Sequence, residues 1–163
     1  MLNVKTRTVD MVHWEQCAED FRWDGSLRDI YITPATLADW QTTYPFLRDY
    51  PEGEYSIDGA IQCPPMTVDE VFALRGTASP MLRFQVGRTL VVFHFFCEEE
   101  IECDIDPRED SSEDDLNTLL EFVRDMGNTT GKVVVITAEN YREQPIISYN
   151  PETCGFRYHE TVA

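Results

Sequence analysis

Two residues near the middle of the chain, His94 and Cys103, are of the types that form a general base and a nucleophile in thiol hydrolases. We expect the segment 100–106 to pair antiparallel with 91–96 through a tight loop. The predicted register sets three residues of one strand opposite three of the other: His94 with Cys103, Phe96 with Ile101, and Val92 with Ile105. A shift by one residue would place carboxylates against this apolar set, which favours the stated register.

This pairing makes Cys103 and His94 the candidates for a Cys–His catalytic pair. A thiol nucleophile, however, needs a thiolate and an open cleft. The predicted position is an apolar strand face, where a free cysteine is more often a small buried hydrophobic residue. We therefore favour a structural role for both residues. No other residue is predicted to be catalytic.

The segment 100–106 also alternates, so that Glu102, Asp104 and Asp106 share the face opposite the apolar residues. Carboxylate oxygens are the ligands of hard cations such as Mg²⁺ and Ca²⁺, which makes these three residues the candidate metal ligands. Alternate residues of a strand lie roughly 7 Å apart, which is wide for one ion unless a loop adds ligands. The simpler expectation is a strand near the edge of the sheet, whose carboxylates prevent unwanted strand pairing.

The same segment belongs to a longer acidic band. Eleven carboxylates lie between Glu98 and Asp115, with Arg108 as the one basic residue among them. A band of this kind is either a solvated face or a docking surface for a cationic partner. The candidate partner-binding residues are Glu98, Glu99, Glu100, Glu102, Asp104, Asp106, Glu109 and Asp110.

The whole chain is strongly acidic, with 30 acidic and 13 basic residues and a formal net charge of −17. Such a field repels phosphates, so binding to nucleic acid or to anionic membranes is disfavoured. A basic protein would instead be attracted over long range. Motifs of nucleotide-binding loops, serine hydrolases and zinc proteases are absent, and His94, Cys97 and Cys103 lack the second pair that a zinc site needs.

The favoured function is therefore a non-enzymatic protein-binding module, similar in its physics to an immunity or inhibitor protein, which binds a basic partner and needs no cofactor. The alternative is a small hydrolase that uses either a metal held by the carboxylates or the Cys–His pair. A homodimer is a further possibility. Five cysteines in irregular spacing, without an apolar export segment at the start of the chain, indicate reduced thiols in the cytoplasm.

A length of 163 residues with 42% hydrophobic content predicts one folded domain over residues 1–163. Hairpins are predicted over 21–32, 54–62 and 81–96, followed by strands at 100–106, 132–137, 145–149 and 155–159. Three helices are expected: one after Thr33 and Pro34, one that starts at Thr67, and one over 112–127 that Gly127 ends, with Ser111 or Ser112 as its cap. This order predicts an α+β fold with one mostly antiparallel, possibly mixed, sheet covered by helices.

Overall fold

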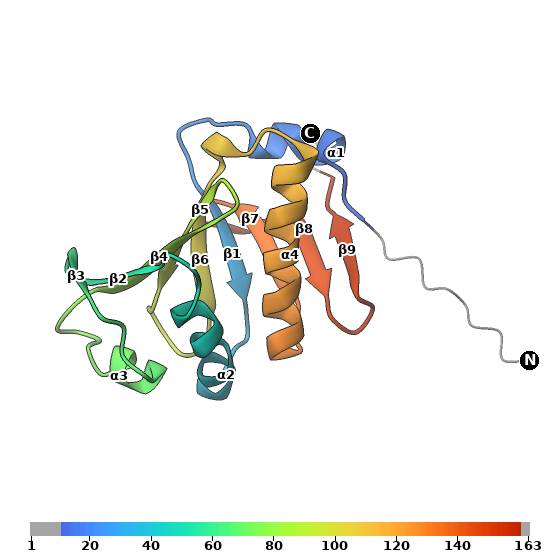
Figure 1. Ribbon diagram of the computed structural model, residues 1–163. Helices are drawn as coiled ribbons and strands as arrows, with labels where there is room; N and C mark the ends of the chain where they lie inside the picture. The colour runs from blue at the N-terminus through green and yellow to red at the C-terminus, as the bar shows by residue number, and fades with distance from the viewer. Residues whose placement is uncertain (1–10, 161–163) are drawn as a thin grey trace, which may run out of the picture.

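The computed structural model of this chain describes residues 11–160 and has one sheet of nine strands in the order β3-β2-β4-β5-β6-β1-β7-β8-β9 (Figure 1). All strand pairs among these residues are antiparallel. The α+β prediction is thus confirmed. The strands are β1 (Arg28–Ile32), β2 (Glu54–Ile57), β3 (Ala60–Gln62), β4 (Pro80–Val86), β5 (Thr89–His94), β6 (Ile101–Asp106), β7 (Val134–Ala138), β8 (Tyr141–Asn150) and β9 (Gly155–Tyr158).

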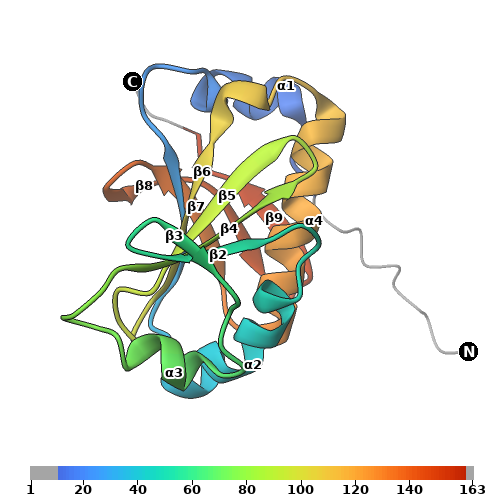
Figure 2. The same cartoon turned by 60° about the vertical axis from the view of Figure 1, so that its left-hand side comes forward.

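Helices cover one face of this sheet. Phe122 packs on Phe84 and Phe93, and Trp40 packs on Phe95, so α4 and α2 lie on the same side of the sheet. Figure 1 shows α4 along the strands, and Figure 2 shows the molecule with β2 and β3 turned toward the viewer. The helices are α1 (Trp14–Cys17), α2 (Leu37–Arg48), α3 (Val68–Phe72) and α4 (Glu113–Thr130), with 3-10 turns η1 (Ala18–Phe21) and η2 (Pro107–Glu109).

The longest helix, α4, forms where the sequence predicts it. The Ser112 side chain caps it by accepting a hydrogen bond from the Asp115 N–H at 3.2 Å. Three acidic residues in the first turn complement the positive end of the helix dipole. The predicted end at Gly127 is wrong: the helix continues to Thr130, and Gly131 in the left-handed conformation ends it. Gly127 is instead a contact point between helix and sheet.

The predicted hairpins over 54–62 and 81–96 are confirmed as β2–β3 and β4–β5. The prediction of two strands over 21–32 is half wrong, because the first part ends the 3-10 turn η1 and only β1 is a strand. Helix α2 starts later than expected, since Thr36 rather than Thr33 is its cap. No helix among residues 11–160 is long and apolar enough to cross a membrane.

The position of β6 also differs from the prediction. We expected this strand near an edge, whereas it lies at the centre of the sheet between β5 and β1. Pairing with both neighbours determines which side chains of β6 face the helices. The helix-covered face of β6 carries Ile101, Cys103 and Ile105, all 0% exposed, and the opposite face carries its three carboxylates. We call this opposite side of the sheet, which α2 and α4 leave uncovered, the open face.

Candidate functional site

The register between β5 and β6 decides which residues can act together. Val92 lies opposite Asp104, Phe93 opposite Cys103, and His94 opposite Glu102. The predicted register, with His94 opposite Cys103, Phe96 opposite Ile101 and Val92 opposite Ile105, is therefore wrong by one residue. The cause is the second apolar set of β5: Val91 and Phe93, followed by Phe95, fill the helix-covered core and so must share a face with the apolar residues of β6.

This register separates the proposed Cys–His pair. Cys103 faces the helices and is fully buried, while His94 lies on the open face. Burial raises the pKa of the Cys103 thiol well above its ordinary value, and the neighbouring carboxylates raise it further. A thiolate at Cys103 is thus disfavoured and has no histidine beside it, so the geometry gives no basis for a thiol hydrolase.

The open face instead gathers three carboxylates from two strands. Asp29 of β1 lies directly opposite Asp104 of β6, and one oxygen atom each of Asp29, Asp104 and Glu102 lie within 4.8 Å of one another. We call these three residues the carboxylate cluster. Of the predicted metal ligands, Glu102 and Asp104 come together, whereas Asp106 forms an ion pair with Arg108 at 2.5 Å.

Sequence reasoning missed Asp29, which β1 brings to the cluster from more than 70 positions away in the chain. Its signal was a single carboxylate inside the otherwise strand-like segment RDIYI. The Asp29 side chain is 2% exposed and accepts hydrogen bonds from the Asn140 N–H at 2.8 Å and from the Tyr31 hydroxyl at 3.0 Å. The turn between β7 and β8 therefore helps to hold this carboxyl in place.

His94 is the basic residue closest to the cluster. Its Nε2 atom is 2.7 Å from an Asp104 oxygen, and the side chains of His94 and Asp104 are 23% and 22% exposed. The Phe96 ring stacks on the imidazole, with ring centres 5.0 Å apart and planes inclined by 6°. Phe96 itself is 64% exposed, whereas within the cluster Asp29 is buried and Asp104 is partly exposed.

Burial and crowding shift the pKa values of the cluster. Burial raises the pKa of Asp29 to about 6, with a hydrogen bond to Asp104 acting in the same direction. Burial and the charges of Asp29 and Asp104 raise the pKa of Glu102. For Asp104, burial acts upward, but hydrogen bonds from His94 and Asp29 outweigh it and lower the pKa. The hydrogen bond to Asp104 raises the pKa of His94.

These shifts predict how stability depends on pH. The folded state holds a proton on Asp29 up to about pH 6, whereas the ordinary carboxyl with a pKa of 3.8 releases it in the unfolded chain. Stability contributed by this group is present below pH 4 and is lost as the pH rises toward 6. Asp29→Asn keeps an acceptor for Tyr31 and Asn140 and donates to Asp104 without a charge. We expect it to raise the free energy of unfolding at pH 7 by about 2 kcal/mol.

Urea unfolding of the wild type and Asp29→Asn between pH 4 and pH 7.5 measures this difference, with Asp125→Asn on the exposed side of α4 as the control. The gain should be small at pH 4 and grow toward pH 7. A constant difference across this range would show that Asp29 does not hold the proton.

The other predicted partner-binding residues do not form one surface with the cluster. Most are held by arginines of the chain itself: Glu98 by Arg75, Glu100 by Arg142, Asp106 by Arg108, and Glu109 by Arg88. Asp110 is 7% exposed and accepts a hydrogen bond from Thr89 at 2.5 Å, while Glu99 is exposed. The acidic band is thus divided, and only Glu102 and Asp104 of it belong to the carboxylate cluster.

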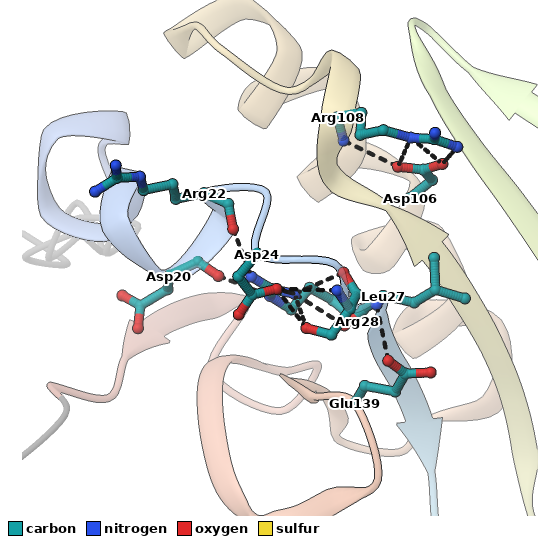
Figure 3. Close-up of polar contacts among 9 residues, drawn as sticks. Asp20, Arg22, Asp24, Leu27, Arg28, Asp106, Arg108 and Glu139 are labelled. Atoms are coloured by element: carbon teal, nitrogen blue, oxygen red, sulfur yellow. Dashed lines mark hydrogen bonds and ion pairs between the residues drawn. The ribbon is translucent and has the colours of Figure 1, made fainter.

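A second polar feature surrounds Arg28, whose side chain is 5% exposed (Figure 3). Its guanidinium donates to the backbone carbonyls of Asp20 at 2.7 Å, Arg22 at 2.9 Å, Ser26 at 3.0 Å and Leu27 at 2.9 Å. These contacts fold the segment 20–27 around one side chain. A cavity of about 600 Å³ lies beside it, with several carboxylates in its lining. The guanidinium also donates to the Ser26 hydroxyl at 2.9 Å and forms an ion pair with Asp24 at 3.5 Å. Because all these partners belong to the segment that the side chain holds together, we assign Arg28 a structural role.

Comparisons with known proteins return no family model, no curated protein and no solved structure that matches this chain. The geometry of the open face therefore carries the functional argument.

Proposed function

We propose that this protein is a non-enzymatic binding module that docks a basic segment of a partner protein on the open face of its sheet. The observation that carries the proposal is the carboxylate cluster at the centre of that face. Among residues 11–160, no lysine or arginine forms an ion pair with Asp29, Glu102 or Asp104. Other carboxylates of the acidic band have such a partner within the chain.

The pKa values support a cationic ligand. Asp29 and Glu102 both bind protons more readily than usual, in part because like charges crowd the cluster. A cation from a partner would relieve this repulsion and favour the ionised carboxylates. The net charge of −17 would also speed the approach of a basic protein, as expected for an immunity or inhibitor protein.

The proposal also covers the cellular location of the protein and the ligands that it does not bind. We place it in the cytoplasm, where its five free cysteines would stay reduced, with no cofactor and no nucleic acid among its ligands. A homodimer that uses the same face would be disfavoured by the repulsion between two carboxylate clusters. Sedimentation at several protein concentrations measures this point directly.

The docking surface can be tested with a pair of variants of equal charge. The double variant Glu102→Gln/Asp104→Asn alters the cluster, and Glu121→Gln/Asp125→Asn alters two exposed residues of α4 by the same net charge. Basic proteins captured from lysate by the wild type are identified, purified and measured for association rate at low and moderate salt. We expect the cluster variant to lower affinity at least tenfold, the α4 variant to change it less than twofold, and the association rate to fall with salt.

Equal losses for both variants would show that general charge, rather than the cluster, attracts the protein. The alternative of a metal-dependent hydrolase is measured on the same variants by thermal unfolding with Mg²⁺, Mn²⁺ or Ca²⁺. A cation that raises the wild-type melting temperature by several degrees, but not that of the cluster variant, would replace the docking proposal.

A further inference from the structure

One arginine of this acidic protein is left without a partner. Among residues 11–160, every other arginine forms an ion pair with a carboxylate or lies over an aromatic ring, whereas Arg157 of β9 does neither. Its side chain is exposed and lines a hollow of about 320 Å³ at the edge of the sheet. The guanidinium is therefore free to bind an anion from outside the described part of the chain.

The surroundings of Arg157 carry no opposing charge. None of the residues that line the hollow within 11–160 is Asp or Glu. His159 also lines it, and its Nε2 atom is 2.9 Å from the Ser148 hydroxyl oxygen. Burial and the charge of Arg157 lower the pKa of His159, so the imidazole is neutral at pH 7. An anion in this hollow would thus meet one cation and no carboxylate.

The strand register places this hollow on the same face as the carboxylate cluster. One row of directly paired residues crosses β1, β7, β8 and β9, and it consists of Tyr31, Val135, Ser148 and Arg157. Residues that pair directly point to the same face of a sheet. Asp29 lies two positions before Tyr31 and accepts the hydrogen bond of its hydroxyl. The row therefore leads from the cluster to Arg157 across the open face.

An apolar strip separates the two charged ends of this row. A second hollow, of about 110 Å³, is lined by residues that include Tyr31, Val133 and Val135. Val133 is 44% exposed and lines the hollow at Arg157 as well. The open face thus offers, in order, a negative end, a shallow apolar strip and a positive end.

The register also gives the distance between the two ends. Neighbouring strands lie about 4.8 Å apart, and residues follow one another at about 3.3 Å along a strand. Arg157 lies three strands away from β1 and two residues away from the level of Asp29. The two Cα atoms are therefore roughly 16 Å apart, a distance that an extended segment covers in about five residues.

We infer that the basic segment of the partner also carries a carboxylate, about five residues from the basic side chain at the cluster, and that this carboxylate binds Arg157. This inference rests on the proposed function and adds the charge pattern of the segment that the open face recognises. Ends of opposite charge accept such a segment in one direction only, which fixes its register on the sheet. Without the carboxylate, attraction to the cluster alone would leave the direction open.

The experiment uses three capped heptapeptides, titrated into the full chain with calorimetric detection. The first is Arg-Arg-Ala-Val-Ala-Ala-Glu, the second has glutamine in place of glutamate, and the third has the composition of the first with glutamate directly after the arginines. At about 0.15 M salt, exposed charges more than about 8 Å apart are largely screened. We expect the first peptide to bind roughly twofold to fivefold more tightly than the second, although it is less cationic. The third peptide should have no such advantage.

Two variants of equal charge assign the effect. Arg157→Gln should remove the advantage of the first peptide. Arg22→Gln removes another exposed arginine, whose side chain is 78% exposed, and should keep that advantage. Circular dichroism of each variant confirms that it is folded, which is expected because both side chains are exposed.

The results that would overturn the inference differ from those that would overturn the docking face. If the first two peptides bind equally, if the glutamine peptide binds more tightly, or if Arg157→Gln keeps the preference, Arg157 does not bind the carboxylate. The docking face stands in these cases, provided that Glu102→Gln/Asp104→Asn weakens the binding of all three peptides. Binding of none of the peptides, or binding that this double variant leaves unchanged, overturns the docking face and the inference together.

Discussion

Replacing Arg28 with methionine is expected to lower the free energy of unfolding by about 4 kcal/mol, the largest effect predicted for a single side chain of this protein. The guanidinium is almost fully buried and donates to four backbone carbonyls of the segment 20–27. Methionine fills a similar volume but donates no hydrogen bond. The four carbonyls then lack a hydrogen-bond donor at a buried position that water reaches poorly, and the decrease in stability is therefore large.

Two further variants separate hydrogen bonding from charge at this position. Arg28→Lys keeps the charge but cannot reach all four carbonyls, so about half of the loss is expected. Arg22→Met removes an arginine of the same segment whose side chain is 78% exposed, and should change stability by less than about 0.5 kcal/mol. Urea unfolding measures all three. An Arg28→Met protein as stable as Arg22→Met would show that the segment 20–27 does not depend on the guanidinium.

Gly127→Ala is expected to destabilise the protein by about 2 kcal/mol, although alanine is the better helix former by about 1 kcal/mol. A Cβ atom at this position would lie 2.6 and 2.9 Å from two Tyr149 ring carbons and 3.2 Å from Val134. Tyr149 is 0% exposed and its hydroxyl donates to Asn128 at 2.7 Å, so the ring cannot turn aside. Helix α4 would have to move away from β7 and β8.

Thermal or urea unfolding of Gly127→Ala is compared with Thr129→Ala, an exposed position of the same helix where only propensity changes. The Thr129 variant should differ from the wild type by less than about 0.5 kcal/mol. Tyr149→Leu in the Gly127→Ala background should lose less than the sum of the two single changes, because it removes the clash. A stabilised Gly127→Ala protein would mean that helix and sheet separate easily.

Local sequence determined much of the fold of this protein. Turn residues Asp58–Gly59 and Gly87–Arg88 fixed two hairpins, and caps at Thr67 and Ser112 fixed where two helices begin. These signals act over a few residues and need no knowledge of the rest of the chain. The order of such elements was sufficient to indicate an α+β class.

Packing over longer distances decided the rest. Both faces of β5 carry apolar residues, so the alternation within β5 and β6 is compatible with two registers. The observed register is the one in which Phe93 and Phe95 are buried against the helices. Gly127 proved to be a contact point for the Tyr149 ring rather than the end of α4, and Gly131 in the left-handed conformation ends the helix.

The candidate site shows the same division. The alternation of β6 determined that Glu102 and Asp104 share a face, which the sequence alone predicts. Only the tertiary structure placed Asp29 beside them, since β1 pairs with β6 across a long stretch of chain. Only the tertiary structure showed that His94 contacts Asp104 and not Cys103. The observed register differs from the predicted one by one residue, and such a change turns every side chain of a strand to the other face of its partner.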